Sequence, residues 1–104
     1  MDPVTANDRD DLFLLDVREI EEWQAGHVTG SMHIPMGELG ARQAELPADQ
    51  TILCICRSGR RSAMVTSALR EAGYAAENLE GGLLAWRSAK LSLTTESGDE
   101  GTVS

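Results

Sequence analysis

The strongest chemical signal in this sequence surrounds one cysteine. Cys56 follows an apolar run at residues 51–55 that is typical of a buried strand, and precedes a stretch with helical periodicity that begins near Arg60. The pattern therefore predicts a thiol at a strand-to-helix junction. The free N–H groups of a first helical turn and the positive end of the helix dipole both stabilise an anion. We expect Cys56 to be largely ionised at neutral pH, because such surroundings lower a thiol pKa from about 8.5 to roughly 3.5–7.5.

Three arginines lie beside this cysteine in an otherwise acidic chain. The 104 residues include 17 acidic and 9 basic residues, for a net charge of −8, and three of the nine cations are Arg57, Arg60 and Arg61. Such a concentration of positive charge predicts a site for a small anion, the alternative being a solvated surface run. The overall negative charge argues against general binding to nucleic acids or to anionic membrane surfaces.

The amino terminus has neither the basic patch nor the apolar stretch of a signal peptide. No apolar run approaches the roughly 20 residues of a membrane span. The sequence therefore predicts a cytoplasmic protein with reduced thiols. On a strand, Cys54 and Cys56 would be about 6.6 Å apart at roughly 3.3 Å per residue, near the upper limit for a disulfide, so we expect no bridge between them.

Apolar patterning predicts an alternation of strands and helices. Strands are expected at residues 12–15, 31–34, 51–55 and 75–79, and helices at residues 19–24, 38–45, 60–72 and 82–90. This order predicts one α/β domain, over residues 1–91, with a central parallel sheet covered by helices on both faces. Residues 92–104 are polar and acidic, and predict a disordered tail.

Ligands of open α/β sheets bind outside the carboxyl ends of the strands. Asp16 and Cys56 each follow a predicted strand, so the two could share one crevice. A catalytic role for Asp16 and Arg18 is possible in principle, but polar contacts that fix the loop after the first strand are the favoured interpretation. His27 is interpreted as a turn histidine bonded to backbone, rather than a general base.

Three motifs occur in order along residues 14–87. They are Leu15-Asp16-Val17-Arg18 with Glu22-x-x-x-Gly26-His27-Val28-x-Gly30-Ser31-x-x-Ile34-Pro35, then Cys56-Arg57-Ser58-Gly59-Arg60-Arg61-Ser62, then Glu80-Gly81-Gly82-x-x-Ala85-Trp86. This ordered set resembles the single-domain rhodaneses. The resemblance implies a small α/β fold and sulfurtransferase chemistry on a cysteine persulfide.

The same resemblance implies roles for the loop residues. Cys56 would attack the outer sulfur of thiosulfate or a similar donor, and a thiol, cyanide or a thioredoxin-like protein would accept the sulfur from the persulfide. The residues expected to bind substrate are Arg57, Ser58, Gly59, Arg60, Arg61 and Ser62, with Asp16 and Arg18 in support. No cofactor is implied, and the spacing of the cysteines and histidines fits no standard zinc site.

Loop length separates this interpretation from a related phosphatase. Phosphatases of similar fold carry a Cys-x-x-x-x-x-Arg loop whose arginine binds phosphate through two bonds. Here Arg61 comes five residues after Cys56, and Ser62 occupies the sixth position. The shorter loop predicts a cradle suited to one sulfur atom. A persulfide carrier with a protein acceptor and a non-catalytic binding module remain the other function classes.

The amino end departs from the family pattern. Only six residues separate Thr5 from Leu12, which is too few for the helix that usually precedes the Asp-Val-Arg strand. The sequence therefore predicts a short edge strand at residues 3–5, followed by a turn.

Overall fold

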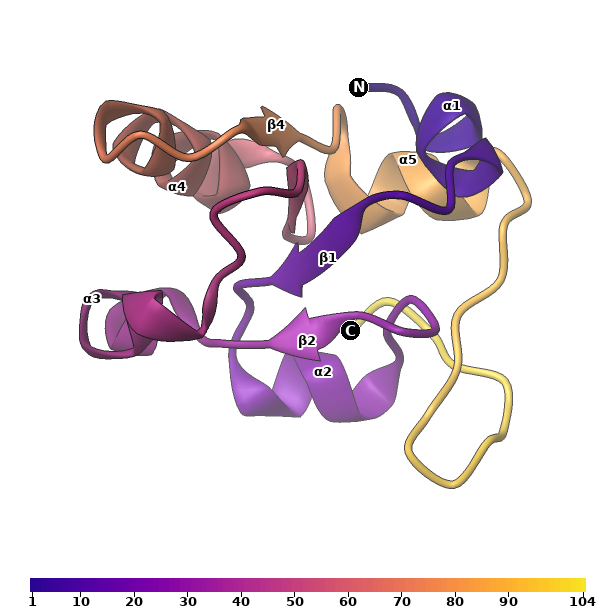
Figure 1. Cartoon of the computed structure of the whole chain (residues 1–104). Helices are drawn as coiled ribbons and strands as arrows, with labels where there is room; N and C mark the ends of the chain where they lie inside the picture. Colours follow the sequence, from indigo (N-terminus) through magenta and orange to yellow (C-terminus); the bar gives the residue numbers. More distant parts are fainter.

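Four parallel strands form the centre of the molecule in the order β2-β1-β3-β4 (Figure 1). The computed structural model describes all 104 residues. The strands are β1 Phe13–Asp16, β2 Met32–His33, β3 Ile52–Ile55 and β4 Ala76–Asn78. The α/β fold with a parallel sheet, predicted from the alternating pattern, is therefore confirmed.

Five α-helices connect or flank these strands. They are α1 Pro3–Asp8, α2 Ile20–Ala25, α3 Leu39–Arg42, α4 Arg60–Glu71 and α5 Gly82–Ser88, and short 3₁₀ turns, Met36–Glu38 and Gln43–Glu45, flank α3. The continuous helix predicted over residues 38–45 is thus divided into three short segments. None of the helices combines the length and the hydropathy that crossing a bilayer requires.

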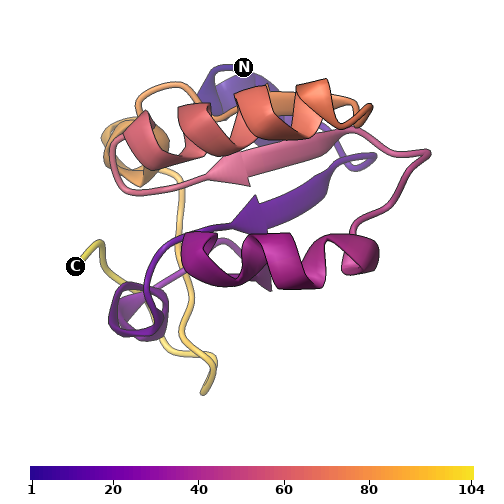
Figure 2. The same ribbon diagram turned by 90° about the vertical axis from the view of Figure 1, so that its left-hand side faces the viewer.

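Strand β3 is buried on both faces and divides the core in two. Ile52 and Cys54 point into one cluster, whereas Leu53 and Ile55 point into the other, because successive side chains of a strand alternate between faces. Helices α3 and α4 lie on one side of the sheet, and α1 and α5 lie on the other (Figures 1 and 2). The apolar run at residues 51–55 is therefore continuous because both faces are covered.

The amino end is helical, so the predicted edge strand at residues 3–5 is wrong. Asp2 caps α1, since its carboxylate accepts a hydrogen bond from the Thr5 N–H at 2.9 Å, and Pro3 occupies the first helical position. Ala6 is buried in the cluster that α5 also covers. One and a half turns suffice here because the cap and the packing, rather than length, stabilise the helix.

The carboxyl segment, residues 92–104, differs from the disordered tail that its composition predicts. Thr94 and His27 exchange both backbone hydrogen bonds, at 2.8 and 2.9 Å, and the Thr102 N–H donates to the Ala25 carbonyl at 2.8 Å. Leu93 is buried in the core. The segment runs back past the end of α2 (Figure 1). Backbone pairing of this kind needs few apolar side chains, which is why composition did not reveal it.

Candidate active site

The structure places Cys56 directly after β3, with its sulfur enclosed by the following loop. Sγ accepts hydrogen bonds from the Gly59 N–H at 3.0 Å, the Ser62 N–H at 3.4 Å and the Ser62 hydroxyl at 3.2 Å. Burial by itself would raise the pKa of the Cys56 thiol, but the hydrogen bonds from Ser62, Gly59 and Ser58 outweigh it, and the net pKa lies below the ordinary value. The direction agrees with the sequence-based expectation.

The second cysteine has the opposite character. Cys54 is on the same face of β3, and burial raises its pKa to about 11 against weaker opposing contributions from Thr66 and Arg70. Both cysteines are free thiols. Of the two thiols, only Cys56 has a pKa below the ordinary value, so it ionises at a lower pH than Cys54.

Backbone geometry lets the loop turn around the sulfur. Gly59 adopts φ +96°, a left-handed conformation that side chains disfavour, and it forms the N-terminal cap of α4. This turn aims its own N–H at Cys56, and α4 begins at the next residue. A glycine between the cysteine and the helix is therefore a geometric requirement of the site.

Helix α5 closes the loop from behind. The Leu83 N–H donates to the Cys56 carbonyl at 2.9 Å, and the Leu84 N–H donates to the Arg57 carbonyl at 3.0 Å. Gly82 permits this approach, because a Cβ there would lie 2.5 Å from the Arg57 carbonyl oxygen. The third sequence motif thus contributes to the site through backbone contacts rather than through side chains.

The three loop arginines occupy different environments. Arg61 forms two hydrogen bonds with the Glu22 carboxylate, at 2.7 and 2.8 Å, and these bonds lower the pKa of Glu22 to about 2. Arg57 is exposed and donates to the Ser104 carbonyl at 2.9 Å. Arg60 is exposed and lies in none of the ion pairs of the structure. The sequence did not distinguish the three, and it did not indicate that Glu22 would neutralise Arg61.

Asp16 and Arg18 form a fully buried ion pair, with Nε–Oδ1 at 2.9 Å and Nη2–Oδ2 at 2.8 Å. Arg18 also donates to the Glu22 carbonyl at 3.2 Å and to the Gly26 carbonyl at 2.7 Å. Neither side chain forms a hydrogen bond with Cys56. The pair therefore holds α2, the helix that carries Glu22 toward Arg61. This geometry fits a structural role for Asp16 and Arg18 rather than a chemical one.

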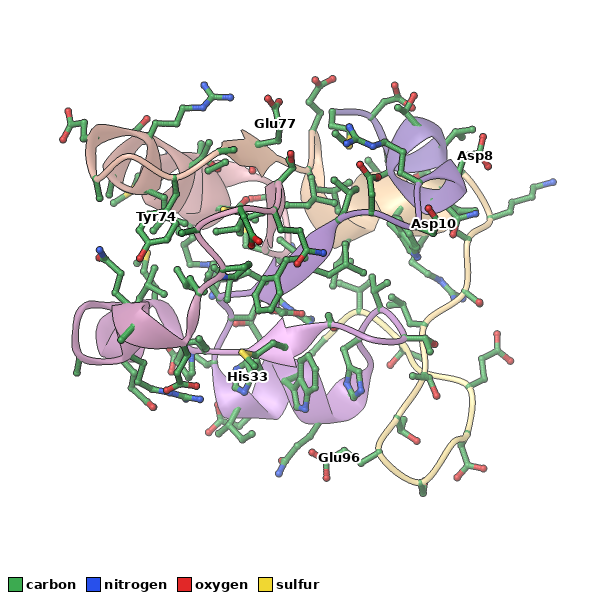
Figure 3. The ribbon with its side chains drawn as sticks, viewed as in Figure 1. Asp8, Asp10, His33, Tyr74, Glu77 and Glu96 are labelled. Atoms are coloured by element: carbon green, nitrogen blue, oxygen red, sulfur yellow. The ribbon has the colours of Figure 1, made fainter.

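His27 lies in a stack of rings and forms no hydrogen bond with the Cys56 thiol. Its Nδ1 is 2.9 Å from the Trp23 carbonyl oxygen, and its ring lies 3.5 Å from the Trp23 ring. His33 stacks on the other face of Trp23 at 4.9 Å, and the indole N–H donates to Glu96 of the carboxyl segment at 3.2 Å (Figure 3). The predicted bonding of His27 to backbone is confirmed, although the residue lies in an isolated antiparallel bridge with Thr94 rather than in a turn.

The signature of the rhodanese-like domain matches residues 4–89. This chain belongs to the rhodanese-like domain family.

Three similar proteins support the assignment. The Bacillus subtilis protein YtwF, provisionally named a sulfurtransferase, is 42% identical over 77 residues, which are 74% of this chain and 75% of YtwF. The Bacillus subtilis protein YrkF, provisionally named a sulfur carrier, is 46% identical over 63 residues, 61% of this chain but only 34% of YrkF. A crystal structure of a rhodanese-related protein from Thermoplasma volcanium superposes with a TM-score of 0.88 at 28% identity, covering 92% of this chain and 97% of that one. Together these relatives support a general role in sulfur transfer.

Sequence reasoning missed one residue of this rhodanese-like site. Asn78, at the end of β4, donates from Nδ2 to the Gly59 carbonyl at 3.1 Å and accepts from the Ser62 hydroxyl at 2.6 Å. The available signal was an amide side chain near the end of the strand predicted at residues 75–79, two residues before the Glu80-Gly81-Gly82 motif. Sequence alone does not reveal that β4 lies beside β3, with Asn78 paired in register with Cys54.

Proposed function

We propose that this protein transfers sulfane sulfur through a persulfide on Cys56, with thiosulfate or a similar anion as the donor. The observation that carries the proposal is the Cys56 sulfur, which accepts hydrogen bonds from two backbone N–H groups and one hydroxyl at the start of α4. These donors stabilise a thiolate, and they would equally stabilise negative charge on a terminal sulfur.

The reaction balances as two displacements at sulfur. The Cys56 thiolate forms a bond to the outer sulfur of thiosulfate, the sulfur–sulfur bond of the donor breaks, and sulfite leaves with that electron pair. A second nucleophile, such as cyanide, a small thiol or a protein thiol, then takes the outer sulfur and returns Cys56 to the thiolate. No oxidant or reductant is consumed in either step.

The test is an intact-mass measurement. Incubation with thiosulfate should add the mass of one sulfur atom to the protein, and cyanide should remove it with release of thiocyanate. An unchanged mass after incubation with thiosulfate and with other sulfane donors would contradict the proposal.

A sulfur-carrier role, with a protein as the acceptor, is the second candidate. The resemblance to YrkF over 61% of this chain favours it. The two roles share the loaded Cys56 and differ in the second step. A carrier should pass sulfur to a protein thiol, such as that of a thioredoxin-like protein, much faster than to cyanide, whereas a thiosulfate:cyanide sulfurtransferase should show no such preference.

Loss of an exposed loop arginine should weaken use of the anionic donor. Arg57 and Arg60 are exposed and form no ion pair with an Asp or Glu side chain, so each can offer a charge-assisted hydrogen bond to the sulfonate end of thiosulfate. Such bonds contribute about 1.5–3 kcal/mol, so Arg57→Ala and Arg60→Ala should each lower the thiosulfate kcat/KM roughly 10- to 150-fold.

Arg42→Ala is the matched control, because it removes the same charge from α3, where Arg42 pairs with Glu45 and Glu38. Arg61→Ala should also lower donor use, and in addition it releases Glu22 from its ion pair. Thiosulfate kinetics that stay unchanged in all three loop variants would refute this role for the arginines.

The size of the loop should exclude phosphate monoesters. The loop from Cys56 to Arg61 is one residue shorter than a Cys-x-x-x-x-x-Arg loop, and the Arg61 guanidinium is paired with Glu22. We expect no appreciable hydrolysis of an activated aryl phosphate under conditions where thiosulfate turnover is readily measured. Inserting one glycine after Ser58 should depress sulfur transfer, because it widens the cradle and moves an arginine to the sixth position. Robust phosphate hydrolysis by the wild type, with thiosulfate inert, would favour the phosphatase instead.

A further inference from the structure

The Ser62 hydroxyl faces two acceptors at once. Its Oγ lies 3.2 Å from the Cys56 sulfur and 2.6 Å from Asn78 Oδ1. A serine hydroxyl carries one proton, so it can donate to only one of these atoms at a time. Ser62 is fully buried, which confines the hydroxyl to these partners. The proton that stabilises a thiolate at Cys56 is therefore the same proton that Asn78 accepts.

The Gly59 carbonyl fixes the orientation of the Asn78 amide. Its Nδ2 donates to the Gly59 carbonyl at 3.1 Å, so Oδ1 must face Ser62. Turning the amide over would bring Oδ1 against the Gly59 carbonyl oxygen, an acceptor against an acceptor. The Gly59 carbonyl also accepts the Ala63 N–H at 3.1 Å, as part of the first turn of α4. The loop backbone therefore keeps one hydrogen bond at this carbonyl even without Asn78.

We propose that Asn78 is a positioning residue that moderates the reactivity of Cys56 by competing with its sulfur for the Ser62 hydroxyl proton. When Cys56 is a thiol, the hydroxyl donates to Asn78 over the shorter distance. When Cys56 ionises, the hydroxyl turns to the sulfur and leaves Asn78 Oδ1 without that partner. Ionisation of the thiol thus costs a hydrogen bond elsewhere, and removing the competing acceptor removes that cost.

The other titratable or charged groups near the Cys56 sulfur affect its pKa equally in the wild type and in the Asn78 variants. The Arg61 guanidinium on α4 and the Cys54 thiol on β3 are the titratable or charged neighbours that interact with Cys56. Arg61 favours the thiolate through its charge, and Cys54 stays protonated because its pKa is about 11. The side-chain hydrogen bonds of Asn78 go to Ser62 and Gly59 and to neither of these groups, so a change confined to Asn78 breaks no hydrogen bond of Arg61 or Cys54.

The experiment measures the pKa of Cys56 by the ultraviolet absorbance of its thiolate as a function of pH, with Cys56→Ser as the blank. Asn78→Leu keeps the size of the side chain and removes its acceptor, so it should lower the pKa of Cys56 by about 0.5–1 unit, as expected for one neutral hydrogen bond. Ser62→Ala removes the donor and should raise this pKa. In the Ser62→Ala background, Asn78→Leu should have no further effect.

The dependence on Ser62 separates competition from simple support of the loop. A higher or unchanged pKa in Asn78→Leu, or an equal shift in both backgrounds, would overturn the proposal. Asn78→Ala provides the same comparison if the leucine variant does not fold. Glu77→Gln is the matched control on β4, because the Glu77 side chain points outward from the sheet (Figure 3) and should leave the pKa of Cys56 unchanged.

The inference rests on Cys56 being the reactive thiol of the proposed function. The titration does not require sulfur transfer, however. A protein that fails to load sulfur from thiosulfate, yet shows the predicted shifts, would refute the proposed function and retain the role of Asn78.

Discussion

Cys56→Ser should lose all sulfur loading from thiosulfate and all formation of thiocyanate from cyanide. A serine hydroxyl in place of the thiol stays protonated near pH 7 and cannot form a persulfide, whereas the hydrogen bonds around Sγ hold the wild-type pKa below its ordinary value. The loading rate of the wild type should therefore rise as pH increases through this lowered pKa and level off above it. Intact-mass spectrometry and a colorimetric thiocyanate assay measure the two steps.

Cys54→Ser is the control for this result, because it removes the other thiol, which lies two residues earlier on β3 and in the same core cluster. The high pKa of Cys54, about 11, keeps it protonated, so its replacement should retain most of the activity after allowance for any loss of folded protein. Sulfur loading that persists in Cys56→Ser, or disappears only in Cys54→Ser, would show that the nucleophile has been assigned to the wrong residue.

Arg18→Met should destabilise the fold more than any other single substitution among the residues that hold the Cys56 loop and α2 in place. The substitution leaves the Asp16 carboxylate buried without its partner, and it also removes hydrogen bonds from the Glu22 and Gly26 carbonyls. Breaking a buried ion pair by removing one partner costs about 3–5 kcal/mol, which is a large part of the about 5–15 kcal/mol by which small domains are stable. Urea denaturation followed by circular dichroism measures the change in the free energy of unfolding.

Arg9→Met is the matched control, since Arg9 forms a comparable two-bond pair with Asp11 on the surface. Solvent screens that pair, so we expect little change in the free energy of unfolding. The double variant Asp16→Leu with Arg18→Met should be less destabilised than Arg18→Met alone, because no charge is left buried. A small effect of Arg18→Met would mean that water or a rearranged α2 compensates Asp16.

The sequence by itself determined the features that depend on neighbouring residues. Apolar runs of about four residues, separated by helical periodicity, predicted the strands and most of the helices, because each pattern reflects which faces of one element are buried. The loop around Cys56 was also predictable, because Cys56, Gly59 and Ser62 lie within seven consecutive residues. Strand end, left-handed turn and helix start follow one another along the chain, so the hydrogen bonds to the sulfur are local.

Tertiary structure alone decided which distant groups complete and restrain that loop. Glu22 neutralises Arg61 across 39 positions in the sequence, and Asn78 reaches Ser62 only because β4 pairs beside β3. The ordered conformation of residues 92–104 and the helix at residues 3–8 likewise depend on packing and backbone pairing with remote segments. Composition and periodicity describe one segment at a time, whereas these contacts depend on which segments the fold brings together.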